Sequence, residues 1–304
     1  LDLTGAHSLP VRRVFVLMGP RILDLFVFQF SLIITTNLAS RLGPGSVSAL
    51  EWGWDAMQLP ETIIGTAFGL VAFPTLAELA ARGEIDRLRS TLGETLRSVI
   101  ALTAPAAVGL ILLGQPLLAF LYQRGQFDAA AVDAVYATLR FFALGLVGHS
   151  CLELAARAFF AQKDTVTPLI VATGSAVVSI GLGIVLAFAP GRGAGAEPLG
   201  ASGLALGNSI AITGEVLVLL AILRRRWGSV EGGAILRSLW RVILASLIMG
   251  LAVWAALQWA QRAGLGSLPT LLVGGVTGLA TYLVAGLLLG VQELRRLPAA
   301  LLGR

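Results

Sequence analysis

Long apolar runs recur from one end of this 304-residue chain to the other, and they restrict its fold more than any other feature. Apolar residues make up 56% of the sequence and charged residues only 13%, which is about half the charged share of a soluble domain. A helix of about 20 apolar residues is long enough to cross the hydrocarbon core of a bilayer. The sequence therefore predicts an all-α, polytopic membrane helix bundle.

About eight transmembrane helices are expected. They cover approximately residues 14–42, 48–80, 90–122, 130–161, 168–189, 199–223, 236–260 and 269–291. Several of these segments are longer than a crossing requires, so they must tilt, kink or protrude from the membrane. Prolines inside them predict kinks or ends, because proline removes a helix hydrogen bond and clashes with the preceding turn. These are Pro20, Pro60, Pro74, Pro105 and Pro116.

Basic residues predict how the segments are oriented. One set of segment ends carries Arg12, Arg13, Arg82, Arg87, Arg89, Arg157, Lys163, Arg224, Arg225, Arg226, Arg237, Arg295, Arg296 and Arg304. The opposite connections carry Arg41, Arg124, Arg192 and Arg262. Since cytoplasmic loops are the ones rich in Lys and Arg, both ends of the segment are expected in the cytoplasm.

The net charge of +5 is accordingly interpreted as a topology signal, and no nucleic-acid partner is expected. The run at 224–241 is interpreted as a basic cytoplasmic linker that either contacts anionic lipid headgroups or simply fixes the topology. The first residue, Leu1, is interpreted as a truncation or domain boundary and not as the start of a signal peptide.

Small and aromatic residues suggest packing roles. Four glycines reduce the side-chain bulk of the sixth segment and predict close contact with a neighbouring helix: Gly200, Gly203, Gly207 and Gly214. The six tryptophans are interpreted mainly as anchors at the membrane interface. The single cysteine, Cys151, excludes an internal disulfide framework and is expected to be a packing residue.

A stripe of polar residues runs along the second apolar segment. Glu51, Asp55, Gln58, Thr62 and Thr66 follow helical spacing and share one face. An ionisable group in hydrocarbon costs roughly 2.5–3.5 kcal/mol on insertion scales, so such groups normally face a bundle interior or a wet cavity. The stripe therefore predicts a water-accessible path through the bundle. The alternative is that Glu51 and Asp55 simply lie near the membrane surface.

Two pairs of opposite charge occur within other segments. Arg21 and Asp24 are one turn apart in the first, and Glu153 and Arg157 are one turn apart in the fourth. Each is either a neutralising pair near a helix end or part of a cavity. His149 lies one turn before Glu153 and is interpreted as a packing or cavity residue, because its sequence neighbours point in other directions and form no nucleophile–base pair.

Three further polar residues lack an obvious local partner. Arg140 stands alone on one side of the fourth segment, while Asn208 and Glu215 share a face of the sixth. A cavity position or a partner on another helix is expected for Arg140 and Glu215. The motifs HExxH, CxxC and GxSxG do not occur, so neither an enzyme, nor a metal site, nor a cofactor is predicted.

Five ordered stretches resemble one known family, the MurJ (MviN) lipid II flippases of the multidrug/oligosaccharidyl-lipid/polysaccharide exporter superfamily. They are MGPRILDLFVFQFSLIITTNLASRLGPGSVSALEW (18–52), QLPETIIGTAFGLVAFPTLAELAARGE (58–84), LYQRGQFD (121–128), RAFFAQKDTVTP (157–168) and GASGLALGNSIA (200–211). The resemblance implies the second lobe of a two-lobe transporter over 1–226, two additional helices over 227–304, and an absent N-terminal lobe.

In that family the two lobes enclose a cavity that alternates between the two membrane faces, and the last two helices border a groove for the lipid tail. The resemblance implies translocation of an undecaprenyl-pyrophosphate-linked saccharide, contact with membrane lipids, and coupling to a monovalent cation. It places Glu51, Asp55, Gln58 and Thr62 in the substrate cavity. Arg21 and Arg140 would join them there as cations, and Asp24, Asn208 and Glu215 would be cation-linked residues.

Two features depart from the family pattern. Asp55 occupies a position where members carry a basic residue for the pyrophosphate, and an anion there repels a diphosphate unless Arg21 or Arg140 compensates. Asparagines frequent in the family's eleventh helix are replaced by Ser179 and Gly183. Two alternatives to the flippase therefore stay open: a non-transporting scaffold that binds cell-wall synthesis proteins, and an exporter of another lipid-linked saccharide or a drug.

Overall fold

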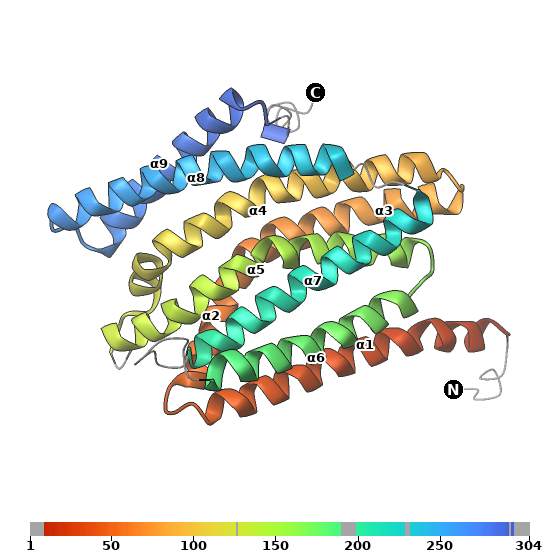
Figure 1. Cartoon of the computed structure of the whole chain (residues 1–304), viewed down its shortest axis with the longest axis horizontal. Coiled ribbons are helices and arrows are strands. Elements are labelled where there is room, and N and C mark those ends of the chain that lie inside the picture. The colour runs from red at the N-terminus through yellow and green to blue at the C-terminus, as the bar shows by residue number, and fades with distance from the viewer. Residues whose placement is uncertain (1–8, 126, 190–198, 229–231, 292, 295–304) are drawn as a thin grey trace, which may run out of the picture.

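The computed structural model describes residues 9–125, 127–189, 199–228, 232–291 and 293–294; residues 9–18, 20, 21, 24, 232 and 234 are described by their backbone alone. Every described element is a helix. The helices are α1 (Leu9–Ser40), α2 (Ser46–Glu61), the π-helix η2 (Thr62–Thr66), α3 (Ala67–Ala81), α4 (Ile85–Tyr122), α5 (Ala129–Ala161), α6 (Val166–Phe188), α7 (Ala201–Trp227), α8 (Gly232–Arg262) and α9 (Ser267–Leu288). They lie side by side in one bundle (Figure 1).

Eight helical rods match the eight predicted segments, because α2, η2 and α3 form one continuous rod over Ser46–Ala81, named here the α2–α3 rod. Seven of the rods, as far as the chain is described, are long and apolar enough to cross a membrane. The remaining rod is α1, in which the described apolar stretch is Leu25–Ser40. The predicted fold class is confirmed: the chain is a multi-pass, all-helical membrane protein.

Helix α5 lies at the centre of the bundle. It packs against α2, α3, α4 and α7, and buried residues occur along its whole length. Helices α1 and α6 form one edge in Figure 1, and α8 and α9 form the opposite edge. The difference in burial between α5 and α6 follows from their positions. In the most apolar 18-residue stretch of each helix, 44% is buried in α5 and 6% in α6. Most of the α6 surface is therefore left for lipid or for a further element.

Backbone-to-backbone packing joins α6 to α7. A Cβ on Gly203 would lie 2.6 Å from the Ala187 nitrogen, and one on Gly207 would lie 2.7 Å from the Gly183 nitrogen. Any larger residue would force the helices apart, so the predicted close contact is confirmed for these two glycines. It is wrong for Gly200 and Gly214, around which a Cβ would meet open space. Gly183, one of the departures from the family pattern, lies at the second of these contacts, against Gly207.

Helices α8 and α9 pair with each other and attach to the remaining helices mainly through α4. The Tyr282 hydroxyl donates a hydrogen bond to the carbonyl of Ala101, which satisfies its polar end inside an apolar contact. Met249 and Val253 of α8 are buried in the same cluster. The pair thus forms a peripheral unit whose outer faces are exposed and apolar.

Two interpretations of the basic segment at 224–241 are wrong. Arg224–Trp227 form the last turn of α7, and α8 begins at Gly232, so most of the segment is helical and is not a linker. Arginines favour this outcome because they are good helix formers and complement the negative C-terminal end of a helix. Trp227 is no interface anchor either: it is 8% exposed and its Nε1 donates to Gln162 Oε1 at 3.2 Å.

Candidate functional site

The predicted polar stripe forms one face of the α2–α3 rod. Glu51, Asp55, Gln58 and Thr62 are all exposed. Between them along the chain, Ala56 and Met57 are buried and form part of a core cluster that also contains residues of α5. The rod is therefore amphipathic in the predicted sense, with its polar face turned away from the helices that pack against it. Thr66, expected to continue the stripe, is instead half-buried.

A wide turn separates Thr66 from the rest of the stripe. Pro60 lies inside α2 and cannot donate to the helix ladder, and the π-helix η2 begins two residues later, at Thr62. The backbone N–H of Thr62 is shared between the carbonyls of Gln58 and Leu59. A π-turn of this kind is a recurrent way to absorb a disturbed hydrogen-bond ladder. The helix end predicted near Pro60 is confirmed, since α2 ends at Glu61, and the rod continues from there as a π-turn.

Glycines hold the back of the rod against α5. A Cβ on Gly65 would lie 2.8 Å from Ser150 Cα, and one on Gly69 would lie 2.7 Å from Arg157 Nε. The rod can approach α5 this closely only because these positions have no side chain. The seam fixes which face of the rod is buried, and it thereby fixes which face carries the exposed polar stripe.

Charged groups of α5 meet the rod at its middle. Arg157 Nη2 lies 2.7 Å from Glu153 Oε2, so the predicted pair between these residues is confirmed. Glu61 of α2 interacts electrostatically with both of them and accepts a hydrogen bond from Thr62 at 3.5 Å. Sequence spacing points to the pair within α5 but not to Glu61, because contacts between helices leave no periodic trace in either segment.

The two candidate cavity arginines differ in what is known of them. Arg140 is exposed on α5, and its guanidinium carbon lies 5.3 Å from the centre of the Phe141 ring. Among the described side chains it forms no ion pair with Asp55, so direct compensation of Asp55 by Arg140 is not observed. The side chains of Arg21 and Asp24 lie outside the described residues, and only their place in α1 is known.

The remaining polar residues occupy the junction of three helices. His149 Nε2 lies 3.2 Å from Asn208 Oδ1, and the His149 ring meets the edge of Trp54 at 5.1 Å between centroids. His149 is therefore a packing residue that links α2, α5 and α7, as interpreted from the sequence. Glu215, on the same helix as Asn208, is only 7% exposed. Asn208 and Glu215 thus face the bundle interior, apart from the exposed stripe.

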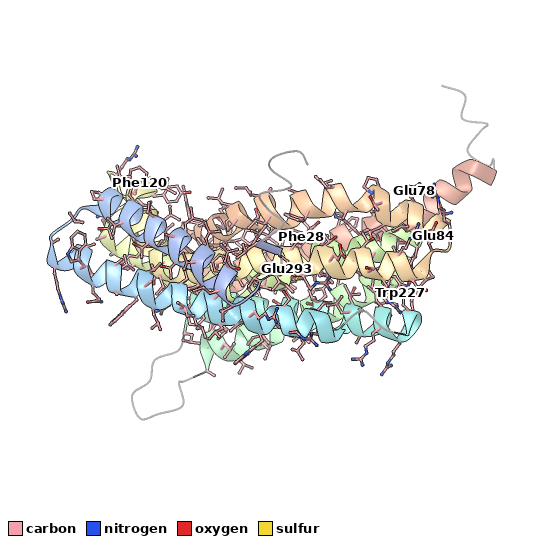
Figure 2. All side chains as sticks on the ribbon, turned by 90° about the horizontal axis from the view of Figure 1, so that it is seen from above. Phe28, Glu78, Glu84, Phe120, Trp227 and Glu293 are labelled. Atoms are coloured by element: carbon pink, nitrogen blue, oxygen red, sulfur yellow. The ribbon has the colours of Figure 1, made fainter. Side chains whose placement is uncertain are left out.

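A second cluster lies at the end of the bundle that carries most of the basic residues, marked in Figure 2 by Glu78, Glu84 and Trp227. Asp164 accepts hydrogen bonds from the backbone N–H of Thr167 at 2.9 Å and from the Thr167 hydroxyl at 2.7 Å, and its Oδ2 lies 2.7 Å from Arg226 Nη1. Burial by itself raises the pKa of the Asp164 carboxyl, but the bonds from Thr167 and Arg226 outweigh it and hold the pKa below 3.8. The cluster ties the start of α6 to the end of α7.

Nothing in this arrangement resembles a metal centre. In the portion of the chain that the structure describes, no three His, Cys, Asp or Glu side chains gather. Cys151 is buried in an apolar cluster with Leu154 and Ala155.

Comparison with known proteins assigns the chain to a family. Residues 3–274 match the sequence profile of the family described as lipid II flippase MurJ. The lipid II flippase MurJ of Burkholderia cenocepacia is 32% identical over 250 residues, covering 82% of this chain and 47% of that protein. A probable lipid II flippase MurJ of Rhizobium meliloti is 31% identical over 251 residues, with 82% and 45% covered. The chain spans about half the length of the curated relatives it matches.

Solved structures share the fold. A lipid II flippase MurJ in an inward closed conformation superposes with a TM-score of 0.73 at 22% identity, covering 92% of this chain and 55% of that one. An outward-facing multidrug resistance MATE family transporter of the MOP superfamily superposes with a TM-score of 0.57 at 15% identity, covering 94% and 66%. The match in profile and the identity to curated relatives agree with the resemblance found in the motifs, and the chain belongs to the MurJ family of lipid II flippases.

Proposed function

We propose that this chain is the second lobe, over residues 1–226, and the two additional helices, over residues 227–304, of a transporter that moves lipid II across the bacterial cytoplasmic membrane. The cargo is an undecaprenyl-pyrophosphate-linked peptidoglycan precursor. Family membership supports a transporter rather than an enzyme. The chain spans only about half the length of its curated relatives. A preceding lobe would supply the other half and close the cavity.

The observation that carries the proposal is the exposed stripe of Glu51, Asp55, Gln58 and Thr62 on a rod that crosses the membrane. Ionisable groups at membrane depth are stable where water reaches them. The stripe faces away from the lobe's own core, so an opposing lobe would enclose it in a wet cavity. Rocking of one lobe against the other would expose that cavity to each side in turn.

We infer that both ends of the segment are cytoplasmic. Arg82, Arg87 and the arginines at the end of α7 lie at one end of the bundle, and Arg124 and Arg262 lie at the other. The end with more arginine is the cytoplasmic one under the positive-inside rule. An accessible cysteine introduced at Arg124 should be labelled from outside the cell, and one introduced at Arg87 only after permeabilisation.

Roles for single residues follow from charge. Arg140 and Arg21 would attract the pyrophosphate, since guanidinium groups pair with phosphate oxygens in a forked geometry. Asp24, Asn208 and Glu215 would respond to a coupling monovalent cation. Asn208 supports this as a polar side chain held in place by His149 within the bundle.

Complementation tests the proposal. The full transporter, with this chain joined to its first lobe, should sustain wall synthesis in cells depleted of their own flippase. Arg140→Gln should reduce rescue at equal protein levels, whereas Arg124→Gln, which removes the same charge at the end of the bundle, should not. A well-expressed protein that fails to rescue growth, or equal effects of the two variants, would contradict the proposal.

A second candidate is a scaffold that binds cell-wall synthesis proteins without transport, or an exporter of a different cargo. The observation that favours it is the pair of exposed carboxylates, Glu51 and Asp55, where a diphosphate would need a cation. Asp55→Arg separates the candidates. Gained or unchanged rescue supports the flippase, while absence of transport in both versions, with partner binding retained, supports the scaffold.

A further inference from the structure

A small basic pocket lies between α4, α8 and the end of α9. Its volume is about 180 Å³, and its polar walls are Arg97, Arg237, Ser238, Arg241, Gly290 and Glu293. In Figure 2 Glu293 lies well in from the end marked by Glu84 and Trp227. The pocket is separate from the stripe on the α2–α3 rod.

Among the residues that the structure describes, the charges that line the pocket do not cancel. Three guanidinium groups face one carboxylate. Arg97 Nε lies 3.5 Å from Glu293 Oε1, and both side chains are largely buried, at 16% and 12% exposed. Glu293 pairs with Arg97, and no other described carboxylate lines the pocket beside Arg237 and Arg241, so these two guanidinium groups leave the pocket positive and attract an anion.

Hydrogen bonds hold the walls of the pocket in place. The Ser238 hydroxyl donates to Glu293 Oε1 at 3.1 Å, and Arg241 Nη1 donates to the carbonyl of Gly290 at 3.0 Å. Gly290, with φ +71°, lies in the turn that follows α9, and its carbonyl reaches Arg241. The Arg241 guanidinium has five N–H donors, of which this bond to a described residue uses one, so Arg241 keeps donors that can contact a ligand. The site is therefore built before a ligand arrives.

Apolar surface adjoins the basic pocket. Leu236, Trp240 and Ile243 are exposed on α8, beside Arg237 and Arg241 along the chain. Leu236 and Trp240 are one turn apart and thus neighbours on the helix surface. Exposed tryptophan is typical of the headgroup level of a bilayer. Charge recognition and an apolar track of this kind suit a ligand that has both an anionic head and acyl chains.

We propose that this pocket binds the phosphodiester group of an anionic membrane phospholipid, with the acyl chains along the exposed side of α8. Forked guanidinium groups match two phosphate oxygens at once. A phosphodiester carries a single negative charge, so it tolerates the neighbouring Glu293 better than a phosphate dianion does. The proposal does not depend on lipid II transport, because it concerns a bulk membrane lipid bound apart from the polar stripe, although α8 and α9 are also the helices that border the family's lipid-tail groove.

Lipid retention tests the proposal. The protein is reconstituted in nanodiscs of phosphatidylcholine with increasing phosphatidylglycerol, and retained lipid is measured by native mass spectrometry. Arg237→Gln/Arg241→Gln should weaken phosphatidylglycerol retention about 25-fold, since each basic residue near an anionic surface contributes roughly a factor of five. Arg224→Gln/Arg225→Gln, the matched control at the exposed end of α7, should leave retention nearly unchanged.

Two further measurements keep the proposal falsifiable. If the double variant does not fold, Arg237→Gln alone, at an exposed position, should still weaken retention roughly fivefold. Inorganic phosphate added in neutral detergent should not displace the bound lipid, because it lacks the apolar contact. Equal losses in the pocket and control variants, or displacement by phosphate alone, would overturn the assignment to a lipid.

Discussion

The α2–α3 rod and the α8–α9 pair both cross the membrane, yet they are built in opposite ways. The rod carries acidic and amide side chains along an exposed face, contains Pro60 and a π-turn, and packs on α5 through glycines. Between Arg241 and Arg262 helix α8 has no charged residue, and α9 has none at all. The charges of the pair are confined to its ends.

The difference indicates the solvent that each region faces. Apolar outer faces on α8 and α9 suit lipid, which provides no hydrogen bonds. The carboxylates of the rod suit water, and keeping them aligned requires a tightly fixed back face. Exposure alone therefore does not distinguish the regions; both are exposed, and the chemistry of the exposed atoms separates them.

Moving a charge between the two regions should have the largest effect. Val276→Asp places a carboxylate at the exposed middle of α9 and should lower membrane insertion by about 3 kcal/mol. Gln58→Asp adds the same charge to the stripe and should cost less than about 1 kcal/mol if water reaches that face. A glycosylation-based insertion assay compares them, and equal losses would show that the stripe faces lipid.

Filling the seam behind the stripe comes next. Gly65→Leu would drive a side chain into the backbone of α5 at Ser150 and should destabilise the folded protein by roughly 2 kcal/mol, as overpacking does. Gly275→Leu on α9 meets open space and serves as the control, with little expected change. Thermal unfolding in detergent measures both. A well-folded Gly65→Leu protein would mean that the seam does not fix the rod.

The charge cluster beside the seam should have a smaller effect. Arg157→Gln leaves Glu153 and Glu61 facing each other without a cation and should cost roughly 1–2 kcal/mol. Glu153→Gln/Arg157→Gln removes both members of the pair and should cost less than the single change. A double-mutant cycle on unfolding gives the coupling, and additive effects of the two changes would rule out the cluster as a unit.

The smallest effect is expected outside the spans, at Asp164. Its pKa is held below 3.8 in the folded protein, so its stabilisation is fully present above that pH and is lost as the pH falls through the folded-state pKa. Asp164→Asn should lower the free energy of unfolding at neutral pH by about 1 kcal/mol. In the variant, the free energy of unfolding should also fall less as the pH is lowered. Asp86→Asn, at an almost fully exposed carboxylate, is the control. Identical acid profiles for the two variants would refute the role of Asp164.

Periodicity predicted what single segments determine by themselves. The boundaries of the rods, the exposed face through Glu51 and Asp55, and the Glu153–Arg157 pair all follow from spacing within one helix. Spacing within one helix does not reveal that Glu61 lies beside Glu153 and Arg157, because Glu61 contacts them from another helix. The linker predicted at 224–241 was wrong because hydropathy reports the depth of a helix in the membrane, while arginine allows the helix to continue beyond it.

The π-turn at Thr62–Thr66 sets the phase between the two halves of the rod. One residue advances an α-helix by about 100° around its axis, and a π-turn accommodates an extra residue. Upstream of the turn, that offset leaves Glu51, Asp55 and Gln58 aligned outward; downstream, it brings Gly69 against Arg157. Converting the turn to regular α-helix would rotate one half against the other, so that outward carboxylates and the inward glycine seam could no longer be satisfied together. The π-turn therefore fixes the rotational offset between the polar face and the packing face of the rod.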